Sequence, residues 1–461
     1  MHSLAYVGHF VATVIGVLAV FWLARHQNLP SGRLWSPALP VWVVVFVALC
    51  AVFFELVSFK ASSPPDRFWD FFNVYYPAGQ AALYHDAGTL RVLIGKGVSG
   101  FVNMPVIAYL FAPFALLGPG MAIALFTLIG LALTVATWFL LVRLAKLELR
   151  ERWLLGLLFF ANGPLMNAVK LGNTSYFILF ALTAGLALLR ARRPASAGAL
   201  LGAAAMIKPP LLLFGVYFAL RRDPRGTLGF AAVCAATAAL SLFLFGWADN
   251  LYWFQTSILQ YSHSWLAAFS VQSIPGFLFR LHASSDILLD WLPHTPQVGE
   301  KLLAQVLTGL LFLISGVVCL RRPSETIAEQ EADDAERRDL QYLLVICLCL
   351  VSSPLTWSHY YAWLLIPTAF FLGSQLSFPS SRAARVFAWA AIALVSPLVE
   401  WPWSIPNSSL MTLYTSLTVS HLLFGGLLWF GLVAWWLAKS GGLLSPSKSV
   451  RASSATPTTA T

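Results

Sequence analysis

Charged residues are scarce in this sequence. They make up 10% of its 461 residues, whereas 58% are hydrophobic and the mean hydropathy is +0.74. A typical soluble domain carries about 25% charged residues, and so small a polar fraction cannot cover the surface of a water-soluble globule. The composition therefore excludes a soluble enzyme, a DNA-binding protein and a disordered chain, and it predicts a polytopic membrane protein.

Paired cysteines and metal-ligand clusters are also lacking. The five cysteines all lie in apolar runs, where none forms a loop pair typical of a disulfide or a metal site. The sequence contains no zinc-type cluster, nucleophile elbow, Walker loop or dinucleotide loop. We therefore expect no metal and no cofactor. These absences also disfavour ATP-driven transport and membrane proteolysis by zinc or by a GxSxG serine.

Apolar runs of bilayer length are abundant. They lie near 6–23, 39–58, 120–142, 153–169, 174–189, 228–247, 303–320, 341–357, 359–373, 386–400 and 416–438. Two further runs, 102–117 and 197–220, are interrupted by prolines. The first run shows neither basic residues before it nor a clear cleavage site, so we expect a retained helix and no removed signal peptide. The pattern predicts an all-α integral membrane protein, a polytopic helical bundle with about 11–13 membrane segments.

Basic clusters indicate which side of this bundle faces the cytoplasm. They lie at 143–152, 190–193, 221–225, 321–338 and 382–385, and from Lys439 onward. The 29 Lys and Arg against 19 Asp and Glu fit such loops and contact with membrane lipids, and we expect no nucleic-acid partner. Helices alternate correctly across the bilayer if the two proline-interrupted runs are re-entrant hairpins or half-helices. Broken helices need protein or a water-filled cavity around them, so both runs are candidates to line a site.

The topology divides the chain into one membrane module and a tail. Residues 1–439 are predicted to form the module, with long extracytoplasmic loops at about 59–101 and 248–302 and a charged cytoplasmic linker at about 321–339. Residues 440–461 are rich in Ser, Thr, Ala and Pro and are predicted to be a disordered cytoplasmic tail. We expect a multi-pass protein of the plasma membrane.

An acidic, aromatic segment directly follows the second predicted span. Residues 65–79 place Asp70 at the outer membrane interface among Trp, Phe and Tyr side chains. Aromatic rings stack on sugars and lower the local dielectric, which makes a carboxylate more basic. A general base for a sugar hydroxyl needs that setting. The same residues also fit an interfacial aromatic belt with an Asp helix cap, so the spacing alone leaves both interpretations open.

Residues 70–83 resemble the opening signature of glycosyltransferase family 87, whose members are GT-C-fold membrane enzymes that use polyprenyl-phosphate sugars. Further elements follow in the family's order. They are the proline-punctuated stretch 105–113, the Gly-rich run 198–210 that ends in Lys-Pro-Pro, the stretch 272–276 with Arg280, and the stretch 353–359. The resemblance covers about residues 60–375. It departs at Gly172-Asn173-Thr174-Ser175, where Gly-Gln-x-Asn is expected, and at Val271, where Asn is usual.

The resemblance implies a GT-C-type bundle that transfers a hexose and inverts the configuration at its anomeric carbon. Mannose is the hexose that we expect first. The donor would be a polyprenyl-phosphate sugar, and a lipid or glycan on the extracytoplasmic face would be the acceptor. Asp70 would be the catalytic base, with Asp66 as the alternative. The side chains expected to hold the donor phosphate or the substrate are Lys208, His359, Arg280, Gln272, Trp357, Tyr75, Tyr76 and Asn173.

Simpler roles stay open for the cationic candidates. Lys208 lies in an apolar run, where a lysine either serves function or snorkels to an interface. His359 fits an aromatic belt, and Arg280 fits an interfacial anchor as well as a phosphate fork. A secondary transporter or a flippase for lipid-linked sugars is the main rival function, because broken helices and a membrane lysine suit it too. A non-catalytic assembly subunit is a further rival. Convergence of Asp70, Lys208 and His359 would favour the enzyme.

Overall fold

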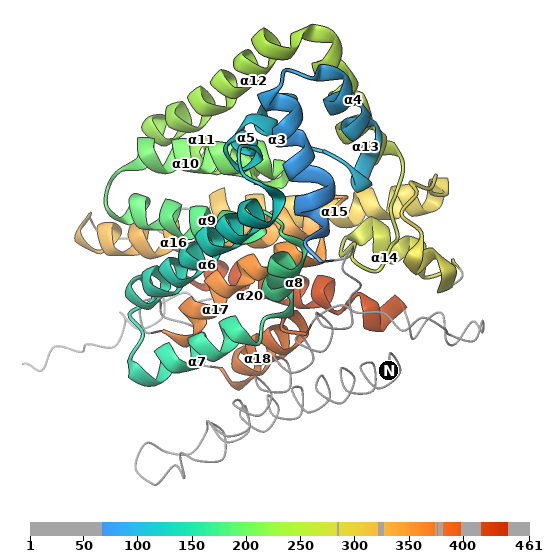
Figure 1. Ribbon diagram of the computed structural model, residues 1–461. Helices are drawn as coiled ribbons and strands as arrows, with labels where there is room; N and C mark the ends of the chain where they lie inside the picture. Colours follow the sequence, from blue (N-terminus) through green and yellow to red (C-terminus); the bar gives the residue numbers. More distant parts are fainter. Residues whose placement is uncertain are drawn as a thin grey trace, which may run out of the picture.

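The computed structural model describes residues 67–283, 285–320, 327–373, 376, 381–397 and 416–440. Among these residues the elements are helical, and no β-strand occurs (Figure 1). The predicted spans at 6–23 and 39–58, the alternative base Asp66 and nearly all of the predicted tail lie outside the described residues. The predicted all-α fold class is confirmed.

The described residues form the following helices in chain order. They are α3 (Tyr76–Leu83), α4 (Ala87–Gly95), α5 (Ala112–Ala115), α6 (Pro119–Leu144), α7 (Leu149–Phe160), α8 (Gly163–Leu171), α9 (Ser175–Arg190), α10 (Pro194–Ile207), α11 (Leu213–Leu220), α12 (Pro224–Trp253), α13 (Gln260–His263), α14 (Ile274–Arg280), α15 (Val298–Leu320), α16 (Ile327–Ser352), α17 (Leu365–Leu372), α18 (Arg382–Val395) and α20 (His421–Ser440). Phe71–Tyr75 and Phe254–Leu259 are π-helical, and 3₁₀ turns cover Gly97–Ser99, Pro105–Leu110, Pro209–Leu212, Ser285–Leu289 and Ser358–Leu364.

Four of the described helices are long and apolar enough to cross a membrane. These are α6, the helical stretch from α12 to α13 with its kink at Gly246, α15 and α20. Helices α7 and α8 make a fifth span if this pair, bent by 47°, crosses as one unit. The composition and these helices identify a helical membrane protein. The total of about 11–13 segments stays a prediction, because it includes runs outside the described residues.

Helical structure extends into the predicted second loop and into the predicted linker. The chain is helical from α12 as far as His263, apart from a kink at Gly246, where φ is 69° and ψ is 178°. At this kink the side-chain amide of Asn250 donates a hydrogen bond to the Gly246 carbonyl at 2.7 Å. The predicted linker is partly helical, since α16 begins at Ile327. Its Asp339 is buried, because the carboxylate pairs with Arg190 at 2.6 Å.

Most of the predicted cytoplasmic clusters meet at one end of the bundle, here called the basic end. The Arg190–Asp339 pair joins the end of α9 to α16, and Arg221 after α11 pairs with Asp334 of α16 at 3.1 Å. Arg337 of α16 donates to a carbonyl at the end of α15 at 2.9 Å. Grouping of basic residues on one side is what the positive-inside rule requires of a membrane bundle.

The proline-interrupted run 197–220 forms a helical hairpin. Helix α10 leaves the basic end, the chain breaks at Lys208, and α11 returns to Arg221 at the basic end. Proline restricts the residue before it and donates no backbone hydrogen bond. Pro209 accordingly follows a Lys208 with extended φ/ψ of −131° and 92°. The hairpin therefore carries Lys208 to its tip, away from the basic end.

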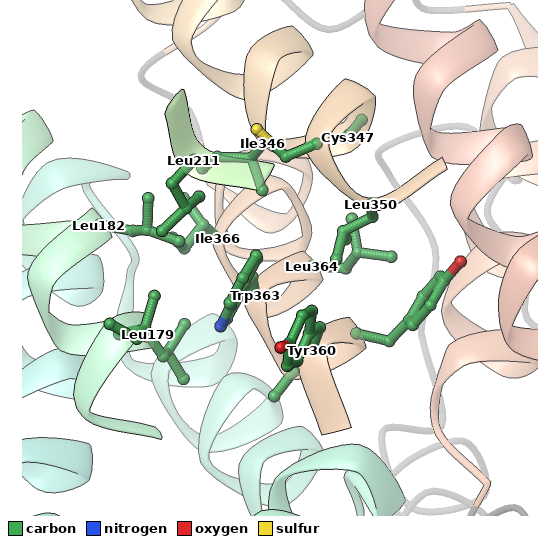
Figure 2. Close-up of a cluster of buried hydrophobic side chains, with 14 of the residues drawn as sticks. Leu179, Leu182, Leu211, Ile346, Cys347, Leu350, Tyr360, Trp363, Leu364 and Ile366 are labelled. Atoms are coloured by element: carbon green, nitrogen blue, oxygen red, sulfur yellow. The ribbon is translucent and has the colours of Figure 1, made fainter. Parts of the chain in front are cut away.

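A buried core lies under this tip. Leu179 and Leu182 of α9, Leu211 of the tip and Ile346 of α16 surround Trp363 (Figure 2). The Trp363 indole N–H also donates to the Ser175 carbonyl at 3.2 Å, at the start of α9. These contacts fix the tip, the start of α9 and the Ser358–Leu364 turn relative to one another.

Candidate functional site

Asp70 stands directly before the π-helical turn Phe71–Tyr75 and is half-buried. The chain enters this turn through Phe68, whose φ of 56° is rare for a residue with a bulky side chain. The Phe68 N–H donates to the Lys170 carbonyl at the end of α8, at 2.8 Å. Phe71 is fully buried, and its ring lies 5.0 Å from that of Phe126 on α6. Asp70 is therefore held next to the end of α8.

A glycine allows the α8–α9 junction to approach this turn. Helix α8 ends at Gly172 in the left-handed region, with φ of 65°. A Cβ at this position would lie 2.8 Å from the Cβ of Phe71. Glycine is thus required both by the backbone conformation and by the close contact. The next residue, Asn173, is placed beside Asp70.

Both the nitrogen and the oxygen of the Asn173 side-chain amide make hydrogen bonds to neighbouring residues. Its Nδ2 donates to Asp70 Oδ2 at 2.5 Å and to the Tyr75 hydroxyl at 3.3 Å. Its Oδ1 accepts from the N–H and the hydroxyl of Ser175, at 3.0 and 2.9 Å. It also accepts from Lys208 Nζ at 3.2 Å. The amide thus links the carboxylate of the first loop to the lysine of the hairpin tip.

Lys208 is only 5% exposed, although a buried ammonium is costly without a partner. Besides the Asn173 oxygen, it contacts the ring of Tyr360, whose centroid lies 4.5 Å from Nζ. No carboxylate lies within ion-pair distance of it in the described ranges. Such a cation is suited to an anionic ligand.

His359 is buried beside Lys208 without hydrogen bonds. It is 4% exposed, and neither ring nitrogen has a partner among the described residues. Its ring stacks on Trp357 at 6.3 Å between centroids and meets the edge of Tyr360 at 5.1 Å. Buried polar atoms are nearly always paired in native proteins, so two unpaired nitrogens in one ring suggest that a ligand supplies the partner.

The surroundings of Asp70 set its acidity. Burial raises the pKa of the Asp70 carboxyl above its ordinary value, whereas the hydrogen bond from Asn173 and the charge of Lys208 act in the opposite direction. Burial dominates, so the ionised carboxylate is a stronger base than an aspartate in water. This is the property expected of a residue that removes a proton.

The structure brings together five of the predicted site residues and Trp357 beside them. They are Asp70, Tyr75, Asn173, Lys208 and His359. The sequence interpretation missed Tyr360 and Ser175, which complete the cluster. Tyr360 directly follows His359, and Ser175 lies in the stretch that departs from the family pattern. Both lie next to predicted residues in the sequence.

Three other candidates belong to the framework around the site. Arg280 is 1% exposed, and its guanidinium donates to the carbonyls of Ala267 and Val271 and to the Ser420 hydroxyl. Gln272 donates to the Val419 carbonyl at 2.8 Å. The Tyr76 hydroxyl donates to the Leu117 carbonyl, also at 2.8 Å. These side chains hold segments together, and none has a contact with Asp70 or Lys208 in the described structure.

Comparison of the sequence with known proteins shows to which class this membrane helical bundle belongs. The class is that of membrane hexosyltransferases. The chain belongs to glycosyltransferase family 87, whose family model matches residues 101–354. The matched stretch contains Asn173 and Lys208, whereas Asp70 precedes it and His359 follows it.

Two characterised relatives are similar to this chain. A polyprenol-phosphate-mannose-dependent alpha-(1-2)-phosphatidylinositol mannoside mannosyltransferase of Mycolicibacterium smegmatis is 27% identical over 315 residues, 64% of this chain and 67% of the relative. A protein of the same name from Mycobacterium tuberculosis is 27% identical over 283 residues, 58% of this chain and 60% of the relative. No solved structure matches the chain.

Proposed function

We propose that this protein transfers a hexose, mannose in the first place, from a polyprenyl-phosphate donor to a glycolipid or glycan acceptor. The observation that carries the proposal is the convergence of Asp70, Lys208 and His359, which come from three separate parts of the sequence. The names of the two relatives support the polyprenyl-phosphate donor. Transfer would take place at the extracytoplasmic face of the plasma membrane.

Asp70 is the base of the proposed reaction. Its carboxylate takes the proton of an acceptor hydroxyl while that oxygen forms a bond to the anomeric carbon of the donor sugar. The bond from this carbon to the phosphate oxygen breaks on the opposite face, and the oxygen leaves with the bonding electron pair. A single displacement of this kind inverts the anomeric configuration.

Lys208 and His359 serve the leaving group. Polyprenyl phosphate departs as an anion, so it requires positive charge and hydrogen-bond donors rather than a proton. The Lys208 ammonium supplies charge, and His359 supplies an N–H from a ring with no other partner among the described residues. Trp357 stacks on His359 and keeps its ring in one plane. The prenyl chain would lie among apolar helices beside the first loop.

The rival function is movement of a lipid-linked sugar without chemistry. Purified protein in liposomes distinguishes the two, with radiolabelled polyprenyl-phosphate mannose as the donor and a membrane glycolipid extract as the acceptor. Transfer of label to glycolipid, absent in Asp70→Asn protein, supports the enzyme. Label that crosses the bilayer and stays on intact donor would identify a flippase. If Asp70→Asn protein retains transfer and Asp66→Asn protein loses it, the base is Asp66.

A further inference from the structure

The backbone fixes which end of the Asn173 amide faces Asp70. Oxygen and nitrogen of an amide are interchangeable in shape, so their assignment must come from the partners. The Ser175 backbone N–H can only donate, and it lies 3.0 Å from Asn173 Oδ1. That end of the amide must therefore be oxygen. The NH2 end consequently faces Asp70, which as a carboxylate can only accept.

The Asn173 amide is fully used within the protein. Its oxygen accepts from Ser175 and Lys208, and its nitrogen donates to Asp70 and Tyr75. An asparagine side chain has two N–H donors and one acceptor oxygen. The contacts inside the protein therefore occupy the side chain, and little capacity is left for a sugar or a phosphate.

The amide also stands between two opposite charges. Asp70 contacts its nitrogen and Lys208 contacts its oxygen, and no direct ion pair joins the two within the described ranges. A direct pair would lower the basicity of the carboxylate and cover part of the ammonium. A neutral amide satisfies a hydrogen bond on each side without neutralising either charge.

We propose that Asn173 is a positioning residue that separates the site into two halves, with Asp70 facing the acceptor hydroxyl and Lys208 facing the donor phosphate. This inference rests on the proposed function, and it replaces the substrate contact expected for Asn173 from the sequence. It also accounts for the buried location of Ser175, whose N–H and hydroxyl hold the amide in one orientation.

Asn173→Asp is the informative variant, because it keeps the shape and exchanges the NH2 for an oxygen. Two carboxylates at this distance cannot both stay ionised easily, and Lys208 gains an anionic partner. The other titratable groups around them are Tyr75, Tyr360 and His359, which are unchanged in the variant. The acid limb of kcat/KM should therefore move to higher pH by at least about one unit, a shift of the size that an interacting charge produces.

Asn73→Asp is the matched control. Asn73 is exposed, lies three positions after Asp70, and donates only to the Trp69 carbonyl in the described contacts. The control adds the same charge to the same turn, but in water, so its pH profile and donor affinity should match those of wild type. Donor affinity of Asn173→Asp, measured with polyprenyl-phosphate mannose, should fall by about tenfold, as expected for a weakened charged hydrogen bond.

Asn173→Ser keeps the test valid if Asn173→Asp does not fold. A serine hydroxyl is shorter than the amide and cannot replace all of its contacts, so kcat/KM of the folded variant should fall at least about tenfold. Wild-type profiles and rates in either folded variant would overturn the inference while leaving mannose transfer by wild type, and hence the proposed function, intact. If wild type itself transfers no sugar, both fail together.

Discussion

The ammonium of Lys208 lies 4.5 Å from the ring centroid of Tyr360, and both side chains are buried. This contact joins the tip of the α10–α11 hairpin to the turn that carries His359. A cation over an aromatic face gains about 0.5–2 kcal/mol without using a hydrogen-bond donor. Lysine has three donors, and one of them goes to Asn173. The contact therefore holds the ammonium in place while leaving donors for a phosphate.

Lys208→Met should weaken donor binding. Methionine retains most of the packing of the lysine stem and removes the charge, so it tests electrostatics rather than cavity formation. A hydrogen bond to a charged group is worth about 1.5–3 kcal/mol, which corresponds to roughly 10- to 150-fold in affinity for polyprenyl-phosphate mannose. Titration of purified protein with this lipid measures it.

Lys96→Met is the control for that measurement, because Lys96 is an exposed lysine that directly follows α4 of the first loop. It removes the same charge from an exposed position that makes no hydrogen bond or ion pair to Lys208 or Asp70 in the described structure, and donor affinity should not change. Unaltered affinity in stable Lys208→Met protein would show that Lys208 is structural.

Asp70→Asn should remove most turnover and leave donor affinity nearly intact. General base catalysis contributes about 10²–10⁴-fold, and an amide cannot accept the proton. Burial already disfavours the charged carboxylate, so the neutral variant should melt at the same temperature as wild type or higher. Transfer assays and thermal unfolding of the same preparation measure both effects. Wild-type turnover in this variant would exclude Asp70 as the base.

The pH profile of transfer should reflect the raised pKa of Asp70. Because burial raises this pKa in the folded protein, the active carboxylate is lost as pH falls through a value above that of an ordinary aspartate. The acid limb of kcat/KM should therefore lie above pH ~4, the reference range for aspartate. The limb should disappear in Asp70→Asn protein, whose residual rate no longer depends on this group. A limb at the ordinary aspartate value would contradict the assignment.

The orientation in the membrane is testable with introduced cysteines. The five native cysteines are first replaced by alanine, and single cysteines are then placed at Lys96, Thr295 and Ala191, all exposed positions. An impermeant thiol reagent added to intact cells should label positions 96 and 295, and it should label position 191 only after lysis. The reverse pattern would put the site in the cytoplasm, where a nucleotide sugar becomes the better donor.

The structure brings together the candidates Asp70, Lys208 and His359, whereas Arg280, Gln272 and Tyr76 make their hydrogen bonds in the surrounding framework. Asp70, Lys208 and His359 were each identified from a polar residue in an apolar or aromatic setting, and such residues are costly unless they serve a purpose. Their convergence could not be read from spacing, because it depends on the Lys208 break and on the Gly172 turn. The Lys208-Pro209 dipeptide did indicate the break, and the run 197–220 forms a hairpin, one of the two arrangements predicted for it.

The helical structure within the predicted linker and the second loop was not predicted, for physical reasons that composition does not show. Asp339 was assigned to a solvated linker because charged runs are usually exposed. Its pairing with Arg190 instead buries it in α16. The second loop is predicted to begin at about residue 248, and the sequence did not show that hydrogen bonds of Asn250 at the Gly246 kink would accompany a helix beyond it. Long-range pairing and side-chain caps of this kind leave no local pattern.

Arg280 is a motif residue whose hydrogen bonds lie within the framework beside the site, and it supplies the last prediction. Its guanidinium holds the carbonyls of Ala267, Ala268 and Val271 together with the Ser420 hydroxyl. Arg280→Met would leave these buried acceptors without a donor, at about 1–3 kcal/mol for each unsatisfied group. The protein should therefore melt several degrees lower, while the fraction that stays folded binds polyprenyl-phosphate mannose with wild-type affinity. A loss of affinity of tenfold or more at an unchanged melting temperature would instead make Arg280 a phosphate ligand. The contrast with Lys208→Met, where affinity falls and stability does not, separates a framework cation from a substrate-binding one within the same assay.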